Sequence, residues 1–148
     1  MSAEIRSWLA ALIEKHHADL LSEWLREQRV ATGRATSTTS DEEARDQSRR
    51  LLTAMRKGLI EGSLDDMTAP AWAETREVLG EVSRERASRG SSPSDTARFV
   101  FSLKQPLFAR IRRESGGDAE RLAEQTWAGS VLIDSLGLYT TEMSQIRR

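Results

Sequence analysis

The chain has 148 residues, the length of one domain that buries a single hydrophobic core without disulfides or metals. It contains no cysteine, which excludes a disulfide framework, a cysteine-ligated zinc site and a cysteine nucleophile, and is compatible with the reducing cytoplasm, where we expect this protein. Lys and Arg number 22 against 23 Asp and Glu, so the net charge of −1 gives no electrostatic reason to expect nucleic acid as a partner. No run approaches the ~20 apolar residues of a membrane helix, so we expect no membrane association.

Apolar residues at spacings of three and four predict an all-α chain of five main helices and no strands. The expected helices cover residues 3–30, 40–61, 69–89, 93–115 and 118–146. The first of these helices is long and either continuous or broken once. The stretch from 31 to 40 is predicted to be a loop. Five helices with short connections predict one globin-like helical bundle, a single domain over residues 1–148.

Several helix ends carry their own signals. Ser40, Ser92 and Asp118 are predicted N-caps, and Pro93 suits a first helical turn because its missing N–H has no intrahelical partner there. In the second helix the expected inner stripe consists of Leu51, Leu52, Met55, Leu59 and Ile60.

The last two predicted helices each carry two apolar stripes. On the fourth, the inner stripe is Thr96, Phe99, Val100, Leu103, Leu107 and Ile111, while Phe101 and Phe108 stand on another side with Gln105 between them. On the fifth, Trp127, Val131 and Leu138 form the second stripe beside an inner stripe of Leu122, Gly129, Leu132, Ile133 and Leu136. A second stripe must be covered, either by helices of the same chain or by a partner chain, and a homodimer is the commonest such assembly. The six residues Phe101, Gln105, Phe108, Trp127, Val131 and Leu138 are therefore candidates for a dimer interface.

Pro106 falls near the middle of the fourth predicted helix. In a regular helix it removes the N–H that would bond the carbonyl of Ser102, at a cost of about 3 kcal/mol or more. A kink at Pro106 would redirect the second half of the helix, either as a fixed feature of packing or as a moving hinge, and the freed carbonyl needs another donor.

The sequence offers no set of catalytic, metal-binding or cofactor-binding residues. His16 and His17 are the only histidines and are adjacent, so on a helix they point about 100° apart and cannot share a metal. Haem would need an axial ligand, usually a histidine on a helix facing the pocket, and none follows residue 17. We therefore expect no enzymatic activity, no metal and no cofactor.

The run SPSDTARFVFSLKQPLF, residues 92–108, closely resembles the N-terminal domain of RsbR-type co-antagonist proteins of the bacterial stressosome. The similarity is most specific over residues 89–111. The flanks agree with it: the first helix is amphipathic and contains tryptophan, and the third begins APxW at residues 69–72.

That resemblance implies a globin-like, haem-free domain that dimerises and acts as a sensory input. In such proteins a C-terminal STAS domain follows and meets a switch kinase, so STAS-domain proteins and that kinase are the implied partners of the full-length protein. This sequence has no room for a STAS domain, so we expect either an N-terminal piece or a stand-alone member. The alternative is a globin-type sensor that binds haem or another ligand.

Overall fold

The computed structural model describes residues 2–32 and 40–146, and within those ranges it contains helices and no strand. The elements are α1 (Ala3–Lys15), α2 (His17–Thr32), α3 (Asp41–Glu61), the short 3-10 helix η1 (Pro70–Trp72), α4 (Ala73–Ser88), α5 (Pro93–Phe101), α6 (Lys104–Glu114) and α7 (Ala119–Ile146). The predicted all-α class is confirmed. Most of the loop expected at 31–40 lies outside the described residues.

Two of the three expected N-caps are formed by side chains that accept backbone N–H bonds. The Ser40 hydroxyl accepts from the Glu43 N–H at 3.1 Å, and the Asp118 carboxylate accepts from the Glu120 N–H at 3.0 Å. Ser92 is also the N-cap of its helix as predicted, and its backbone N–H donates to the Asp95 carboxylate at 3.1 Å in a capping box. These contacts satisfy backbone groups that have no partner inside a helix.

Two segments expected to form one helix each are divided in the structure. The segment 3–30 breaks at His16, which separates α1 from α2, and the segment 93–115 breaks between α5 and α6. At the first break the His16 Nε2 lies 3.1 Å from the Glu114 carboxylate at the end of α6. This hydrogen bond joins the break between α1 and α2 to α6. This hydrogen bond holds the pKa of Glu114 below its ordinary value.

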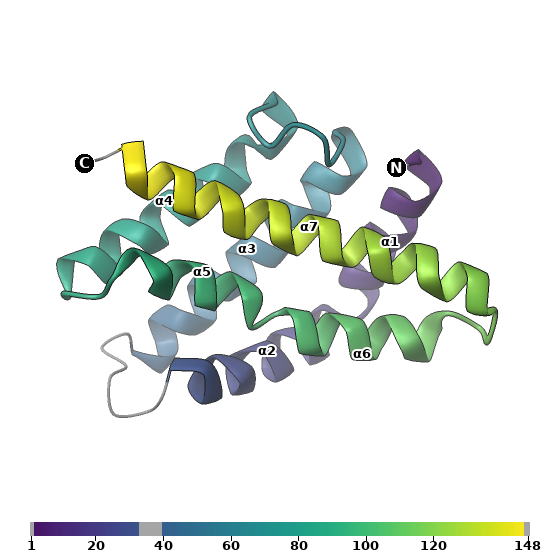
Figure 1. Cartoon of the computed structure of the whole chain (residues 1–148). Coiled ribbons are helices and arrows are strands. Elements are labelled where there is room, and N and C mark those ends of the chain that lie inside the picture. The colour runs from purple at the N-terminus through teal and green to yellow at the C-terminus, as the bar shows by residue number, and fades with distance from the viewer. Residues whose placement is uncertain (1, 33–39, 147–148) are drawn as a thin grey trace.

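The helices pack so that α7 runs along the front of the molecule beside α5 and α6, with α3 behind it (Figure 1). Helix α3 contacts α1, α2 and α4, while α7 also contacts α1 and α4. The largest side chains buried between these layers are Trp24, Trp72 and Phe99. Each such aromatic ring removes about 150–250 Å² of surface from water, and the many buried leucines fill the space around them.

Ile60 departs from the predicted inner stripe of α3. Leu51, Leu52, Met55 and Leu59 are fully buried as expected, but the side chain of Ile60 is 54% exposed. Consecutive residues on a helix are about 100° apart, so Ile60 follows the last inward position and turns out of the core. The prediction for this residue was wrong.

Candidate interaction face on α5, α6 and α7

The inner stripes predicted for the last helices lie in the core. Every residue of the α5–α6 stripe is buried, as are Gly129, Leu132, Ile133 and Leu136 of α7, with Leu122 half-buried. The second stripes face outward. We call Phe101, Gln105, Phe108, Trp127, Val131 and Leu138 the outer face.

The outer face leaves large apolar side chains in contact with solvent. Trp127 is 67% exposed, Leu138 59% and Phe101 39%, while Phe108 and Val131 are half-buried and Gln105 is exposed. Trp127 and Leu138 lie on one side of α7, eleven residues apart, with Val131 between them. A tryptophan exposed to this degree beside further apolar side chains is typical of an interaction surface.

The two phenylalanine rings of the outer face pack against glycines of α7. A Cβ added at Gly129 would lie 3.4 Å from Cε1 of Phe108, and one added at Gly137 would collide with the ring of Phe101. The rings therefore rest directly on the α7 backbone. An ion pair of 2.7 Å joins Lys104 on α6 to Asp134 on α7, and the Lys104 ammonium lies 5.2 Å from the centre of the Phe101 ring.

Neither the contacts of the two phenylalanine rings with glycines of α7 nor the ion pair between Lys104 and Asp134 was predicted from the sequence. Both join residues about 20 to 36 positions apart, so helical periodicity carries no signal for them. A glycine inside an otherwise regular helix is the available hint, because it lowers helix propensity by about 1 kcal/mol relative to alanine and often marks a close packing contact.

The break between α5 and α6 comes earlier than the kink expected at Pro106. Helix α5 ends at Phe101 and α6 begins at Lys104, so Ser102 and Leu103 form the α5–α6 break. Pro106 is the third residue of α6 and is buried. A helix leaves its first N–H groups without intrahelical partners, so the missing N–H of Pro106 carries little of the expected cost.

The Phe99 carbonyl loses its helical donor at the α5–α6 break, in addition to the Ser102 carbonyl that Pro106 leaves without one. The Leu103 N–H, the donor to Phe99 in a continuous helix, bonds the Val100 carbonyl at 3.1 Å instead. Two side chains replace it: the Trp24 indole N–H donates to the Phe99 carbonyl at 3.1 Å, and the Ser102 hydroxyl donates at 2.7 Å. Leaving such a buried carbonyl without a partner would cost about 1–3 kcal/mol.

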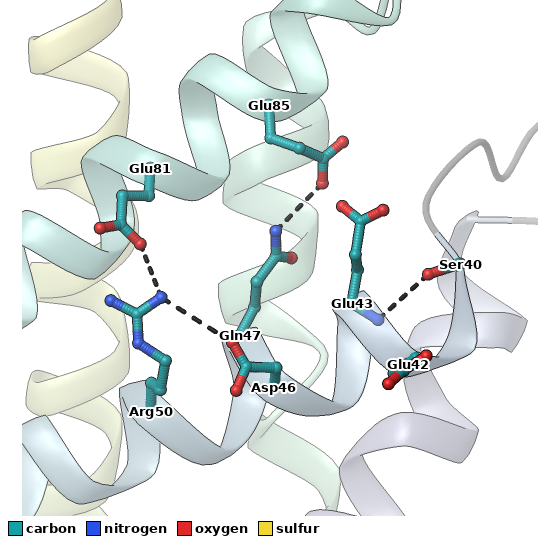
Figure 2. A pocket seen from close by; sticks show the side chains of 8 residues that line it. All are labelled: Ser40, Glu42, Glu43, Asp46, Gln47, Arg50, Glu81 and Glu85. Carbon is teal, nitrogen blue, oxygen red and sulfur yellow. Dashed lines mark hydrogen bonds and ion pairs between the residues drawn. The ribbon is translucent and has the colours of Figure 1, made fainter.

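A polar cleft of about 550 Å³ lies between α3 and α4, away from the outer face (Figure 2). Its lining carries five carboxylates together with Ser40, Gln47 and Arg50; the carboxylates are Glu42, Glu43, Asp46, Glu81 and Glu85. Arg89 pairs with Glu43 and Glu85, each at 2.9 Å, and the Gln47 amide donates to Glu85 at 3.0 Å. The Arg89–Glu43 and Gln47–Glu85 contacts connect one helix to the other, so the cleft residues contribute to the packing of α3 on α4.

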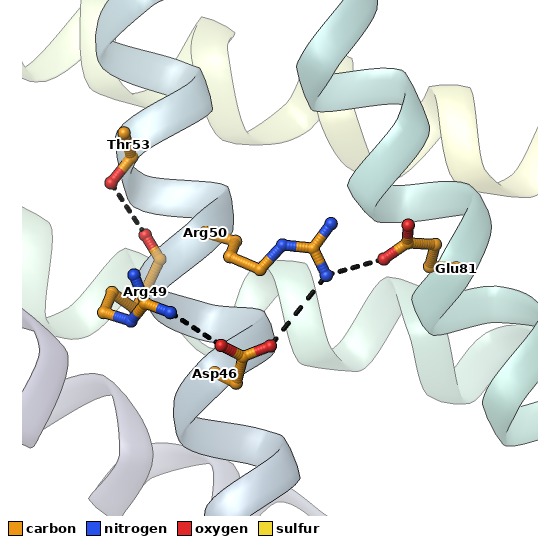
Figure 3. Close-up of polar contacts among 5 residues, drawn as sticks. All are labelled: Asp46, Arg49, Arg50, Thr53 and Glu81. Atoms are coloured by element: carbon orange, nitrogen blue, oxygen red, sulfur yellow. Dashed lines mark hydrogen bonds and ion pairs between the residues drawn. The ribbon is translucent and has the colours of Figure 1, made fainter.

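Arg50 makes the shortest of these connections (Figure 3). Its guanidinium lies 2.6 Å from the Glu81 carboxylate on α4 and 3.9 Å from Asp46 one turn earlier on α3. The hydrogen bond from Arg50 holds the pKa of Glu81 below its ordinary value. Arg50 and Glu81 are both more than one third exposed, so solvent screens the pair and its contribution is at most about 1 kcal/mol.

We expect Glu81→Gln to lower the free energy of unfolding by up to about 1 kcal/mol at pH 7. Because the folded-state pKa of Glu81 is depressed, its contribution is present above the unfolded value of about 4.3 and is lost as the pH falls through the folded-state pKa. Urea unfolding at pH 7 and pH 3 measures this. Glu14→Gln, at a more exposed pair with Arg56, is the control with a smaller effect. An equal loss for Glu81→Gln at both pH values would contradict the assignment.

Within residues 2–32 and 40–146, no group of three or more His, Asp or Glu side chains is arranged to hold a metal ion. His16 is bonded to Glu114, and the adjacent His17 has a buried Nε2 with no hydrogen-bond partner. None of the described helices is both long enough and apolar enough to cross a membrane.

The described helices form an all-α fold, and the outer face exposes the apolar side chains of Phe101, Trp127 and Leu138. A family model described as the RsbT co-antagonist protein rsbRD N-terminal domain matches residues 18–145. The chain belongs to this family, as the resemblance of residues 92–108 predicted, and the family is one of N-terminal domains of stressosome co-antagonist proteins. Neither the curated proteins nor the solved structures yielded a match.

Proposed function

We propose that this chain is a non-enzymatic sensory and dimerisation domain that passes a signal through α7 to a STAS output domain. Its partners would be a second copy of itself and, through the full-length protein in the cytoplasm, STAS-domain proteins and a switch kinase. Membership of the co-antagonist family supports the signalling role. The exposed apolar side chains of the outer face carry the proposal of a dimer.

A second copy is the occupant that the outer face fits best. The face is apolar at Trp127, Val131 and Leu138, and its charged neighbours Lys104 and Asp134 already neutralise each other. The ion pair leaves the middle of the face without an unpaired charge, as the apolar centre of a two-fold symmetric interface requires, while the exposed Arg112, Glu124 and Glu142 follow one helical turn beyond its apolar residues.

Helix α7 is suited to relaying a signal because its two sides contribute to the core and to the outer face. Its inner side contributes Leu132, Ile133 and Leu136 to the core, and its outer side carries Trp127 and Leu138. Any change in how the outer faces meet therefore acts on the same rigid helix that packs against α5, α6, α1 and α4.

Trp127→Glu tests the dimer because the side chain is mostly exposed and contributes little to the monomer's core. We expect the dimer dissociation constant to rise at least tenfold, about 1.4 kcal/mol, with a nearly unchanged melting temperature. Phe101→Glu should act in the same direction but also lower stability, because its ring rests on Gly137. Sedimentation across a concentration series together with thermal circular dichroism separates the two effects.

The matched control is Ile60→Glu. Ile60 is an apolar side chain of similar exposure, 54%, on α3 and outside the outer face. It should leave the dimer unchanged. A wild-type protein that is monomeric at every concentration, or a Trp127→Glu variant that dimerises as well as wild type, would refute the proposed dimer.

A further inference from the structure

We infer that Trp24 is a positioning residue that holds the α5–α6 break and thereby sets the arrangement of the outer face. The inference rests on the proposed function, since that proposal makes the outer face a surface for self-association. Trp24 lies on α2 and is completely buried, so it cannot touch a partner bound to the outer face. Any effect of Trp24 on association must pass through the elements that it contacts.

The indole N–H contributes directly to the geometry of the break. It donates to the Phe99 carbonyl at 3.1 Å and to the Ser102 hydroxyl at 2.9 Å, and that hydroxyl donates to the same carbonyl. In a continuous helix the Leu103 N–H would occupy the Phe99 carbonyl. If the break straightened, the Leu103 N–H and the buried indole N–H of Trp24 would compete for the Phe99 carbonyl. A buried donor that loses its acceptor costs free energy, so the straight form is disfavoured.

Ring packing fixes Trp24 in the position from which it donates. The Trp24 and Phe99 rings lie 5.0 Å apart with an interplanar angle of 31°. On Phe99 the guanidinium of the buried Arg86 lies 4.8 Å from the ring centre. Helices α2, α4 and α5 are thus joined at the residue whose carbonyl the indole caps, so α2 controls the end of α5.

The break separates the two phenylalanines of the outer face. Phe101 is the last residue of α5 and rests on Gly137, whereas Phe108 lies in α6 and packs near Gly129. A change in the angle between α5 and α6 cannot keep both rings seated on the same rigid helix α7. The hydrogen bonds of Trp24 therefore position the two rings relative to each other.

The variant that tests this inference is Trp24→Phe, which keeps an aromatic ring and removes the N–H. The matched control is Trp72→Phe, because Trp72 is also completely buried and its indole donates to the Ser63 carbonyl at 2.8 Å, but it lies outside α5, α6 and α7. Two quantities are measured on the whole chain: the dimer dissociation constant by sedimentation, and backbone amide exchange of residues 99–108 by mass spectrometry.

We expect Trp24→Phe to raise the dissociation constant at least fivefold and to speed exchange within residues 99–108. Trp72→Phe should lower the melting temperature similarly, with a dissociation constant within twofold of wild type and unchanged exchange in that segment. Ser102→Ala, a milder change that leaves the bond from Trp24 to the Phe99 carbonyl, should show smaller effects in the same direction.

Equal behaviour of the two tryptophan variants in both measurements would overturn the inference, because it would mean that Trp24 only stabilises the core. Faster exchange with unchanged association would also overturn it, since the break would then not control the outer face. A monomeric wild-type protein would refute the proposed dimer and the link to association. In that case the exchange of residues 99–108 still decides separately whether Trp24 holds the break.

Discussion

Gly58→Ala is expected to lower the free energy of unfolding by about 2 kcal/mol or more. A Cβ at residue 58 of α3 would lie 2.7 Å from Cδ2 of Trp72 and closer still to Cε3 and Cζ3. Trp72 has no space to retreat, because its ring is completely buried and its Nε1 donates to the Ser63 carbonyl. Overpacking typically costs about 1–3 kcal/mol and occasionally more, and an overlap this severe with a buried ring lies at or above the upper end of that range. The cost therefore exceeds the gain of about 1 kcal/mol in helix propensity by about 2 kcal/mol or more.

Gly80→Ala provides the comparison, because the same substitution on α4 meets only a flexible neighbour. The atom nearest to its added Cβ is Nη1 of Arg84 at 3.3 Å, the end of an exposed side chain. This variant should gain up to about 1 kcal/mol from helix propensity. Thermal unfolding of both variants should therefore show opposite shifts, with a decrease of roughly 5–8 °C for Gly58→Ala. Equal melting temperatures would mean that Trp72 does not pack against Gly58.

Local sequence signals were sufficient for the features that depend on neighbouring residues. The caps at Ser40 and Asp118 follow from side chains that reach backbone groups two or three positions away. The separation of core and outer face on α7 follows from the helical period, which assigns Leu132 and Trp127 to different sides. The role of the outer face in a dimer remains a prediction.

The features that sequence periodicity missed depend on residues far apart in the chain. The α5–α6 break lies at Ser102 and Leu103 instead of Pro106, and one of the two donors that replace the helical bond there is Trp24, 75 residues from Phe99. A proline shows that a helix is interrupted nearby, but its position does not reveal whether it lies inside a kink or in the first turn of a new helix. That distinction depends on tertiary contacts.

Gly137→Ala is expected to weaken self-association at least tenfold while lowering the free energy of unfolding by only about 1 kcal/mol. The added Cβ would collide with Cζ and Cε1 of Phe101 and lie 3.3 Å from Cε2. Unlike Trp72, Phe101 is 39% exposed, so its ring can turn toward solvent instead of straining the core. Lys104, whose ammonium lies over that ring, would then lose its contact with it. The monomer would keep its fold, but the outer face would change shape.

Gly129→Ala is the matched control on the same helix. Its Cβ would lie 3.1 Å from Cδ1 of Ile111 and 3.4 Å from Cε1 of Phe108, so side-chain ends need to shift by only a few tenths of an ångström. We expect nearly unchanged stability, because helix propensity offsets this strain, and a much smaller effect on the dimer. Sedimentation and thermal unfolding of the two variants measure both quantities. If Gly137→Ala dimerised as tightly as Gly129→Ala, the position of the Phe101 ring would be irrelevant to association, and the dimer would have to form through the Trp127 end of the outer face alone.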